Sequence, residues 1–403
     1  MPYYEIVQGG VPLLWCELAT ILTLLLTCWL LINRKCSDKR VKHLLYICLT
    51  IQICILLFDN HIGNLLLGDD SRTYEYTGWR LACGEFPETT VNYSRYVISP
   101  IYRILRYRFP LILGALNILL NILLNIKLYK ILKLLNINYK TQLIGMNLLF
   151  LFPLSLILRT SILRECLIVF FLVNSFYYIL LGIKFKQTEC LIKCFIFLLL
   201  GSFFHSGCVF ISLGYIYILL KNNMINSKYK VYLLILVILG VFILKDILLK
   251  KLANGNLETV LKINNSIRLR NANTGYLRDI RTNSALDVIL YLPLFMVFFL
   301  FSPMVFEIKN VITLGVFLFN SSIYFYVSIK CWIWWTKIKK KLRKQERILL
   351  IGLFISFIVT VAVFSVGTRN FGTAMRHRDK IFFILIIMYM ILKDRYLRLK
   401  RKY

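Results

Sequence analysis

Long apolar runs recur along the whole of this 403-residue chain, and 59% of its residues are hydrophobic. Most runs are about 17–25 residues long, the length that a helix needs to cross a hydrocarbon core about 30 Å thick. Inside lipid, every backbone N–H and C=O must find its partner within its own segment, so each run must be a helix. The pattern predicts an all-α, polytopic integral membrane protein rather than a soluble globular one.

The runs predict a single transmembrane domain that covers residues 1–403 and holds about 11–12 transmembrane helices. The first run, Val11 to Ile32, is too long for a signal-peptide core, and no basic segment precedes it, so we expect it to remain as a helix. The expected spans are 11–32, 42–58, 109–128, 142–158, 165–183, 190–204, 207–220, 231–248, 286–304, 310–329, 348–367 and 381–392.

Basic stretches between these runs indicate the orientation. Residues 33–43, 330–347 and the tail from Lys393 carry five, eight and six Lys/Arg, each against a single acid. Cytoplasmic loops of membrane proteins are enriched in Lys and Arg, so we place all three stretches inside, together with 127–140 and 184–193. This bias also explains the net charge of +31 without nucleic acid as a partner.

The count of spans conflicts with these charges in the second half of the chain. If every predicted run crossed, the basic stretch 330–347 would lie outside. Either 190–220 is one long kinked crossing, or one segment between 286 and 335 is re-entrant. We favour the second alternative, because it keeps the long hydrophilic segment 249–285 on the outer side.

The other long hydrophilic segment, 59–108, is expected on the outer (periplasmic) side, and its first part is acidic. Six of the chain's 19 carboxylates lie between Asp59 and Glu88. Asp69 or Asp70 could act as a general base or hold a divalent cation. Tyr74 could contact a sugar ring, and Arg80 begins a series of outward arginines suited to phosphate oxygens. The alternative is a solvated loop with no chemistry.

Two further candidate sites lie at the ends of apolar runs. Arg159, Arg164 and Glu165 occur at a short turn between two spans, where charged side chains are costly unless they are paired or functional. His205 stands in a run of about thirty mostly apolar residues and could transfer a proton near neutral pH. The alternative for each is structural: snorkelling and helix capping for the first, and a buried hydrogen bond for the second.

Cationic side chains gather again in two later loops. Segment 249–285 carries seven Lys/Arg, and the loop from Gly367 to Lys380 carries four. If both loops lie outside, the charge bias does not explain them, and an anionic ligand does. The candidate residues are Arg278 and Arg281 in the first loop and Arg369, Arg376, His377 and Arg378 in the second.

The chain has no nucleotide-binding loop, no zinc-protease HExxH motif and no GxSxG nucleophile motif. An enzyme that draws on soluble nucleotide energy is therefore not expected, and its substrate should already be activated.

With these residues in view, the chain resembles bacterial polysaccharide polymerases of the O-antigen and capsule type (Wzy-type, with the EpsG-like branch). Four short elements in order carry the resemblance across residues 60–392. They are Asp70-Ser71-x-x-Tyr74, Leu163-Arg164-Glu165, His205-Ser206-Gly207 and the stretch NFGTAMRHRDK from Asn370 to Lys380. Such polymerases are similar in plan to lipid-dependent membrane glycosyltransferases of the GT-C type.

The resemblance implies an enzyme of the bacterial inner (cytoplasmic) membrane whose active site faces the periplasm. It would transfer a glycan from undecaprenyl diphosphate to the hydroxyl of an acceptor repeat unit. Its partners would be the undecaprenyl-diphosphate-linked oligosaccharide, membrane lipid and a protein that sets chain length. No cofactor is expected, although a divalent metal stays open.

From the residues we formulate the hypothesis that Arg164, Arg376 and Arg378 clamp the diphosphate while Asp70 or His205 activates the acceptor hydroxyl. The alternatives are another polyprenyl-phosphate-dependent transferase of GT-C type and a non-enzymatic flippase for lipid-linked oligosaccharides.

Overall fold

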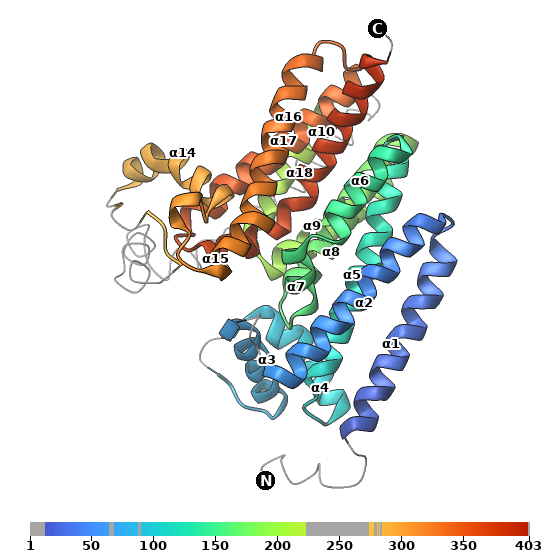
Figure 1. Ribbon diagram of the computed structural model, residues 1–403, viewed down its shortest axis with the longest axis vertical. Coiled ribbons are helices and arrows are strands. Elements are labelled where there is room, and N and C mark those ends of the chain that lie inside the picture. Colours follow the sequence, from blue (N-terminus) through green and yellow to red (C-terminus); the bar gives the residue numbers. More distant parts are fainter. Residues whose placement is uncertain are drawn as a thin grey trace. The chain divides into compact units, whose positions relative to one another are not determined.

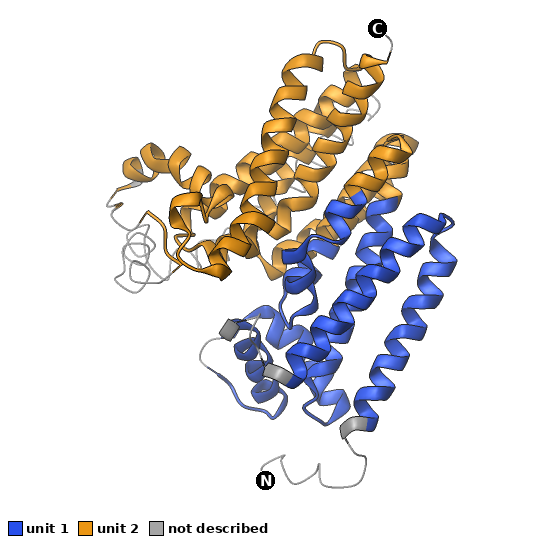
Figure 2. Cartoon of the chain, viewed as in Figure 1, with its two compact units in different colours: residues 1–129, 146–170 blue, residues 130–145, 171–403 orange. Residues whose placement is uncertain are grey.

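The computed structural model describes residues 13–63, 68–87, 90–222, 274–277, 280, 282 and 284–401. Within these ranges the regular structure is helical, and the one β-pairing is an isolated bridge between Gly275 and Asn370. The expected all-α class is therefore confirmed. The chain divides into two compact units: unit 1 is 1–129 with 146–170, and unit 2 is 130–145 with 171–403 (Figure 2).

Unit 1 contains α1 (Leu13–Lys35), α2 (Lys39–Phe58), α3 (Gly68–Ala82), α4 (Ser99–Leu105) and α7 (Pro153–Thr160) (Figure 1). Asp38 caps α2, because its carboxylate accepts hydrogen bonds from the backbone N–H groups of Arg40 and Val41 at 2.9 and 3.2 Å. The hydrophilic segment 59–108 folds into α3, α4 and two short π-helical turns, Asp59–Gly63 and Ser94–Ile98. Its polar residues are thus carried mainly on helices.

Three helices contribute residues to both units: α5 (Pro110–Leu134), α6 (Tyr139–Phe150) and α8 (Glu165–Phe185). The axes of α6 and α7 are bent by 49° at the break between them. Pro153 begins α7 there, and a proline has no backbone N–H with which to continue the preceding helix.

Unit 2 further contains α9 (Thr188–Phe204), the 3₁₀ turn Ser206–Phe210, α10 (Ile211–Lys221), α14 (Ala285–Phe301), the 3₁₀ turn Val305–Glu307, α15 (Val311–Val316), the π-helical turn Phe317–Ser321, α16 (Ser322–Ile338), α17 (Lys344–Val366) and α18 (Phe371–Lys400). Helix α18 forms the interior of this unit, since every residue from Arg378 to Leu392 is buried. The predicted crossing 381–392 is therefore a helix enclosed by protein.

Six helical segments among the described residues are long and apolar enough to cross a membrane, and the bent pair α6–α7 would make a seventh. They are Trp15–Lys35, Lys39–His61, Pro110–Leu134, Glu165–Phe185, Val311–Ile338 and Lys344–Val366. The chain is accordingly a multi-pass membrane protein. The predicted span 231–248 lies outside the described residues.

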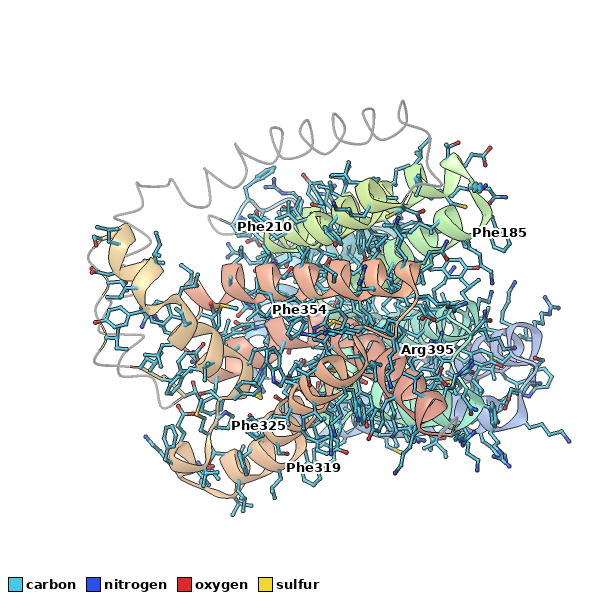
Figure 3. The ribbon with its side chains drawn as sticks, turned by 90° about the horizontal axis from the view of Figure 1, so that it is seen from above. Phe185, Phe210, Phe319, Phe325, Phe354 and Arg395 are labelled. Carbon is cyan, nitrogen blue, oxygen red and sulfur yellow. The ribbon has the colours of Figure 1, made fainter. Side chains whose placement is uncertain are left out.

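The outer faces of unit 2 carry large apolar side chains. Phe319, Phe325 and Phe354 are all more than half exposed, on the π-helical turn before α16, on α16 and on α17 (Figure 3). An exposed aromatic surface of this kind is unfavourable in water and suits contact with lipid tails.

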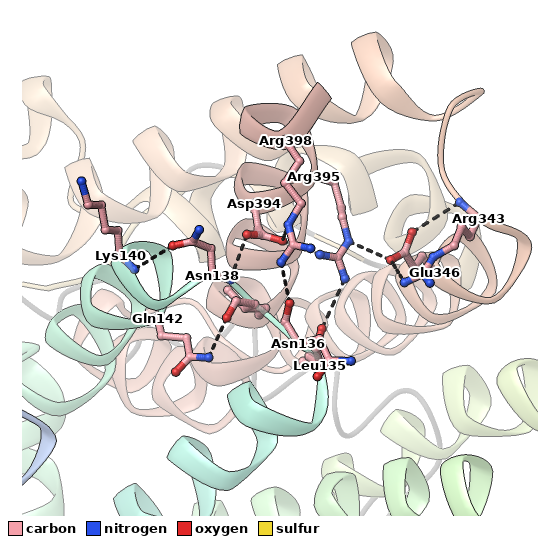
Figure 4. Close-up of polar contacts among 11 residues, drawn as sticks. Leu135, Asn136, Asn138, Lys140, Gln142, Arg343, Glu346, Asp394, Arg395 and Arg398 are labelled. Atoms are coloured by element: carbon pink, nitrogen blue, oxygen red, sulfur yellow. Dashed lines mark hydrogen bonds and ion pairs between the residues drawn. The ribbon is translucent and has the colours of Figure 1, made fainter. Parts of the chain in front are cut away.

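One end of unit 2, here called the basic end, brings together three of the predicted cytoplasmic stretches (Figure 4). Asp394 accepts from the backbone N–H of Asn138 at 2.9 Å, and Arg398 donates to the carbonyl of Asn136 at 2.7 Å. Arg395 donates to Glu346 at 2.7 Å. The α5–α6 turn, the start of α17 and the C-terminal helix thus share one end, as the charge pattern predicts.

The other end of α17, where His205 contacts His377, is here called the histidine end. Its contacts bear on the conflict in the count of spans. α9 ends beside His377, since His205 contacts that residue, whereas α10 ends at Asn222 in a cavity at the basic end. They are two separate helices that end at opposite ends of unit 2. The chain on both sides of α14 contacts the histidine end, through Tyr276 before it and Ser302 after it. The region 286–304 therefore does not cross unit 2, which agrees with the re-entrant alternative.

Two glycines allow α10 and α17 to approach closely. A Cβ atom added at Gly214 would collide with the backbone carbonyl of Gly352 and with Ser356, whose hydroxyl donates to the Ile211 carbonyl at 2.8 Å. Small residues at such contacts let helix backbones pack where the hydrophobic effect provides no drive.

Replacing Gly214 with alanine should therefore destabilise unit 2 by about 1–3 kcal/mol, because the added methyl forces the two backbones apart. The thermal midpoint of the detergent-solubilised protein measures this. Gly315→Ala is the matched control, since a Cβ there meets nothing within 4 Å, and its midpoint should not fall. Equal midpoints for the two variants would contradict close packing at Gly214.

Candidate functional site

The histidine end joins two of the motifs singled out from the sequence. His205 follows the last residue of α9, and His377 lies in the second turn of α18. Their Nε2 atoms are 3.3 Å apart, and the two ring centroids are 4.8 Å apart. At this distance one imidazole donates its Nε2–H to the other when one ring carries a proton on Nε2 and the other does not. Residues 172 positions apart thus lie within hydrogen-bonding distance.

Phe364 and Thr368 hold the histidine pair. The Phe364 ring lies 5.0 Å from the His205 ring and 4.9 Å from the His377 ring, measured between centroids. Thr368 Oγ1 lies 3.4 Å from His377 Nδ1. Gly207 makes room for Phe364, because a Cβ atom at position 207 would meet its ring.

A short extended segment of the second hydrophilic loop pairs with the turn before α18. Tyr276 N donates to the Arg369 carbonyl at 3.0 Å, and Phe371 N donates to the Thr274 carbonyl at 2.9 Å. The Tyr276 hydroxyl donates to the Thr368 carbonyl at 2.7 Å, and burial raises the pKa of this phenol. These hydrogen bonds place residues 274–277 beside residues 368–371, at the histidine end of unit 2. Arg278 and Arg281 lie outside the described residues.

The three arginines of the last loop have different surroundings. Arg378 has no exposed surface and donates from Nη1 and Nη2 to the carbonyls of Leu300 and Ser302, both at 2.7 Å. Arg369 is buried with its guanidinium carbon 4.0 Å from the centre of the Phe295 ring, and burial lowers the pKa of this guanidinium. Arg376, next to His377, is half-buried. Arg376 is thus the more accessible cation, and Arg378 caps the end of α14.

In unit 1, the predicted acidic residues Asp69 and Asp70 belong to α3. Asp70 is exposed, and the Asp69 side chain lies outside the described residues. The guanidinium of Arg164 lies 5.8 Å from the centre of the Tyr74 ring, so two of the predicted site residues meet. Arg80 forms an ion pair with Glu85, and this partner raises the pKa of the guanidinium.

A third carboxylate on α3 was not singled out from the sequence. Glu75 is 4% exposed and accepts two hydrogen bonds from Arg108, at 2.9 and 2.6 Å, and a third from the Tyr102 hydroxyl at 2.7 Å. Burial and then the neighbouring carboxylate raise the pKa of the Tyr102 phenol. This ion pair fixes α3 to α4 and to the start of α5, and therefore orients Tyr74.

The buried polar groups around Arg159 were also not predicted. Arg159 is 1% exposed and donates to Asn121 at 3.4 Å. Asn121 donates to Gln52 at 2.9 Å, and Gln52 donates to Thr160 at 3.1 Å. This amide network links α2, α5 and α7 within the apolar interior, where such hydrogen bonds hold helices together.

The signal for that network was available in the sequence. Three asparagines recur at every fourth position of α5, which places them on one face of the helix: Asn117, Asn121 and Asn125. Asn117 donates to the carbonyls of Ser161 and Leu163, so it holds the turn that carries Arg164 and Glu165. Glu165 itself is buried at the first turn of α8.

Each unit therefore brings together some of the predicted site residues. In unit 2 these are His205, Arg369, His377 and Arg378, and in unit 1 they are Tyr74 and Arg164. No group of three His, Cys, Asp or Glu side chains suited to a metal ion occurs in the described part of the chain. No protein-family model, no curated protein and no solved structure matches this chain.

The Glu75–Arg108 pair generates a stability prediction. Glu75→Gln should lower the free energy of unfolding by about 2 kcal/mol, because it removes the charge that accepts three hydrogen bonds. Thermal unfolding followed by tryptophan fluorescence measures the change. The matched control is Glu85→Gln, which removes an exposed partner of Arg80 and should leave the midpoint unchanged. If the midpoint of Glu85→Gln fell as far as that of Glu75→Gln, the loss would come from removing any negative charge and not from breaking the buried ion pair.

Proposed function

We propose that this chain is an O-antigen or capsule polysaccharide polymerase of the bacterial inner membrane. It transfers a glycan from undecaprenyl diphosphate to the hydroxyl of an acceptor repeat unit at the periplasmic face. The observation that carries the proposal is the His205–His377 pair, with accessible Arg376 beside it, at the end of unit 2 opposite the basic end.

The orientation of the proposed site follows from charge. Lys and Arg are retained preferentially on the cytoplasmic side of a membrane, so the basic end faces the cytoplasm. Helix α17, with 23 residues, is about 35 Å long, enough to carry the histidine end to the opposite face. A lipid-linked sugar that is already activated can react there without a nucleotide.

The histidine pair supplies the base. The acceptor oxygen attacks the anomeric carbon of the donor glycan as the bond from that carbon to the diphosphate oxygen breaks. The hydroxyl proton passes to one imidazole, and the imidazolium that forms is stabilised by its hydrogen bond to the second ring. Asp70 stays the alternative base, since it is exposed on α3.

Arginines supply the positive charge for the leaving group. Developing charge on a diphosphate oxygen is stabilised by preorganised cations. Arg376 and Arg164 are half-buried and suit this role, whereas the Nη atoms of Arg378 already serve two carbonyls. In this proposal Arg378 therefore positions α14 and the turn before α18, and Arg376 in unit 2 and Arg164 in unit 1 are each a candidate cation of the diphosphate clamp.

The finer architecture belongs to the same proposal. It has about 11–12 membrane helices in a GT-C-like plan, and the six or seven segments of sufficient length among the described residues support its multi-pass character. A flippase would require charged side chains lining a path through the spans. Arg159 is the strongest such candidate, but it is 1% exposed and held by an amide, which favours the enzyme.

Replacing either histidine with alanine should lower the rate of polymerisation about 10²–10⁴-fold, because the proton acceptor is lost. Purified protein is incubated with lipid-linked repeat units, and gel analysis follows the ladder of products. His43→Ala, an exposed histidine on α2, is the control and should retain the ladder.

Wild-type ladders from both His205→Ala and His377→Ala would exclude the pair as the base. In that case, loss of the ladder in Asp70→Asn would transfer the role to Asp70. A single added sugar in place of a ladder would identify the alternative GT-C transferase, and no product with any variant or with the wild type would favour the flippase.

The proposed clamp makes a separate prediction. Arg376→Gln and Arg164→Gln should each reduce turnover about 10²–10³-fold, since each removes a cation that acts on the developing diphosphate charge. The same gel assay measures the effect, with membrane content checked by immunoblot. Arg95→Gln, at an exposed position, is the matched control. Full-length ladders from both clamp variants would contradict the assignment.

A further inference from the structure

The basic end of unit 2 contains a cavity that the proposed reaction does not use. Its volume is about 330 Å³, within the range of small-molecule sites. Residues from five separate parts of unit 2 line it: the turn after α5, the end of α8, the end of α10, the start of α17 and the C-terminal part of α18. The cavity is thus built by the tertiary fold and does not belong to one helix terminus.

Positive charge exceeds negative charge around the cavity. Its ionisable lining residues are Lys184, Arg343, Arg395 and Glu346, which is three cations against one carboxylate. Glu346 is held from both sides, at 2.7 Å by Arg343 and at 2.7 Å by Arg395 (Figure 4). The lining therefore keeps a surplus of positive charge after its internal ion pairs are counted.

The cations differ in how firmly they are held. Arg395 is 12% exposed and is fixed by Glu346, by Asp394 and by the carbonyl of Leu135. Arg343 is 78% exposed at the start of α17, and Lys184 is exposed near the end of α8. A fixed guanidinium deep in the cavity and two adaptable cations at its rim are a suitable arrangement for a phosphate group.

The rest of the cavity wall combines three polar residues, Asn136, Asn222 and Gln345, with apolar ones. Leu180, Ile218 and Ile391 line it from α8, α10 and α18. α8, which carries Leu180, is a candidate membrane span, so this part of the wall lies near the end of a span, although most of α8 is buried inside the protein. A free inorganic anion gains nothing from such a wall, whereas a phospholipid places its headgroup among the cations and its first acyl methylenes against the apolar residues.

We propose that this cavity is a binding site for an anionic phospholipid, whose phosphate contacts Lys184, Arg343 and Arg395 and whose acyl chain lies along α8. The bound lipid bridges the α5–α6 turn, α17 and α18 at the basic end. The site is independent of the proposed transferase activity, because it lies at the other end of α17 from the histidine pair.

The test uses the full chain, purified in a neutral detergent and stripped of lipid. It is titrated with phosphatidylglycerol, with phosphatidylcholine of the same chains, and with inorganic phosphate. Native mass spectrometry counts bound lipid, and the thermal midpoint reports stabilisation by a ligand that binds the folded state. One equivalent of phosphatidylglycerol should bind and raise the midpoint, and the other two ligands should do neither.

The double variant Lys184→Gln/Arg343→Gln should weaken phosphatidylglycerol binding about tenfold or more, since each basic residue near a lipid headgroup contributes substantially. Its matched control is Lys339→Gln/Lys340→Gln, which removes the same charge from exposed positions outside the cavity. Ile183→Trp keeps all charges but fills the cavity, and it should also weaken binding.

Equal affinities in the cavity variant and in its charge-matched control would overturn the proposal. It would also fail if phosphatidylcholine bound as tightly as phosphatidylglycerol, or if inorganic phosphate alone raised the midpoint as far as the lipid does. Polymerising activity does not enter these readouts, so failure of the transferase proposal would leave this result unaffected.

Discussion

A guanidinium without exposed surface, that of Arg378, donates to the carbonyl oxygens of Leu300 and Ser302 where α14 ends. The last carbonyls of a helix have no partner within it and carry partial negative charge, so a buried cation there is stabilised twice, by hydrogen bonds and by the helix dipole. This contact ties α14 to the first turns of α18. The position of His377, one residue before Arg378, depends on it directly.

Several further contacts at the histidine end together determine where His377 and His205 lie. Asn370 caps α18 through the backbone N–H groups of Gly372 and Thr373, which sets where the helix begins and therefore which residues occupy its second turn. Residues 274–277 pair with the preceding turn and fix its carbonyls. His205 then meets His377 only because Gly207 admits the ring of Phe364. Each step satisfies polar groups that lipid could not.

The sequence predicted the fold class and the end-to-end charge pattern well, because apolar length and Lys/Arg bias are one-dimensional signals that the membrane itself imposes. It also identified His205, Arg376 and His377 as residues of interest. It did not identify the pairing of the two histidines, which depends on packing between α9 and α18. It left the number of crossings around α14 open, because hydropathy cannot tell whether an apolar helix crosses or returns.

The unpredicted polar residues share one physical reason. The sequence could not name the partners of Glu75 and Asn121, because Arg108 and Gln52 are distant in sequence. A charged or amide side chain in an apolar segment signals that some partner exists but not which one. For Arg378, a predicted diphosphate ligand, the sequence did not indicate the burial or the two backbone carbonyls to which it donates.

Both ends of unit 2 carry arginines, but these arginines differ in their access to water. At the basic end, Arg343 and Lys184 stand at a cavity rim where water reaches them, so their charge remains available to an anionic ligand. At the histidine end, Arg369 and Arg378 are desolvated, and burial of a cation is favourable only where carbonyls or aromatic faces compensate for lost water. Access to solvent thus separates the described arginines of the histidine end: Arg369 and Arg378 are buried, whereas Arg376, next to the histidine pair, is half-buried.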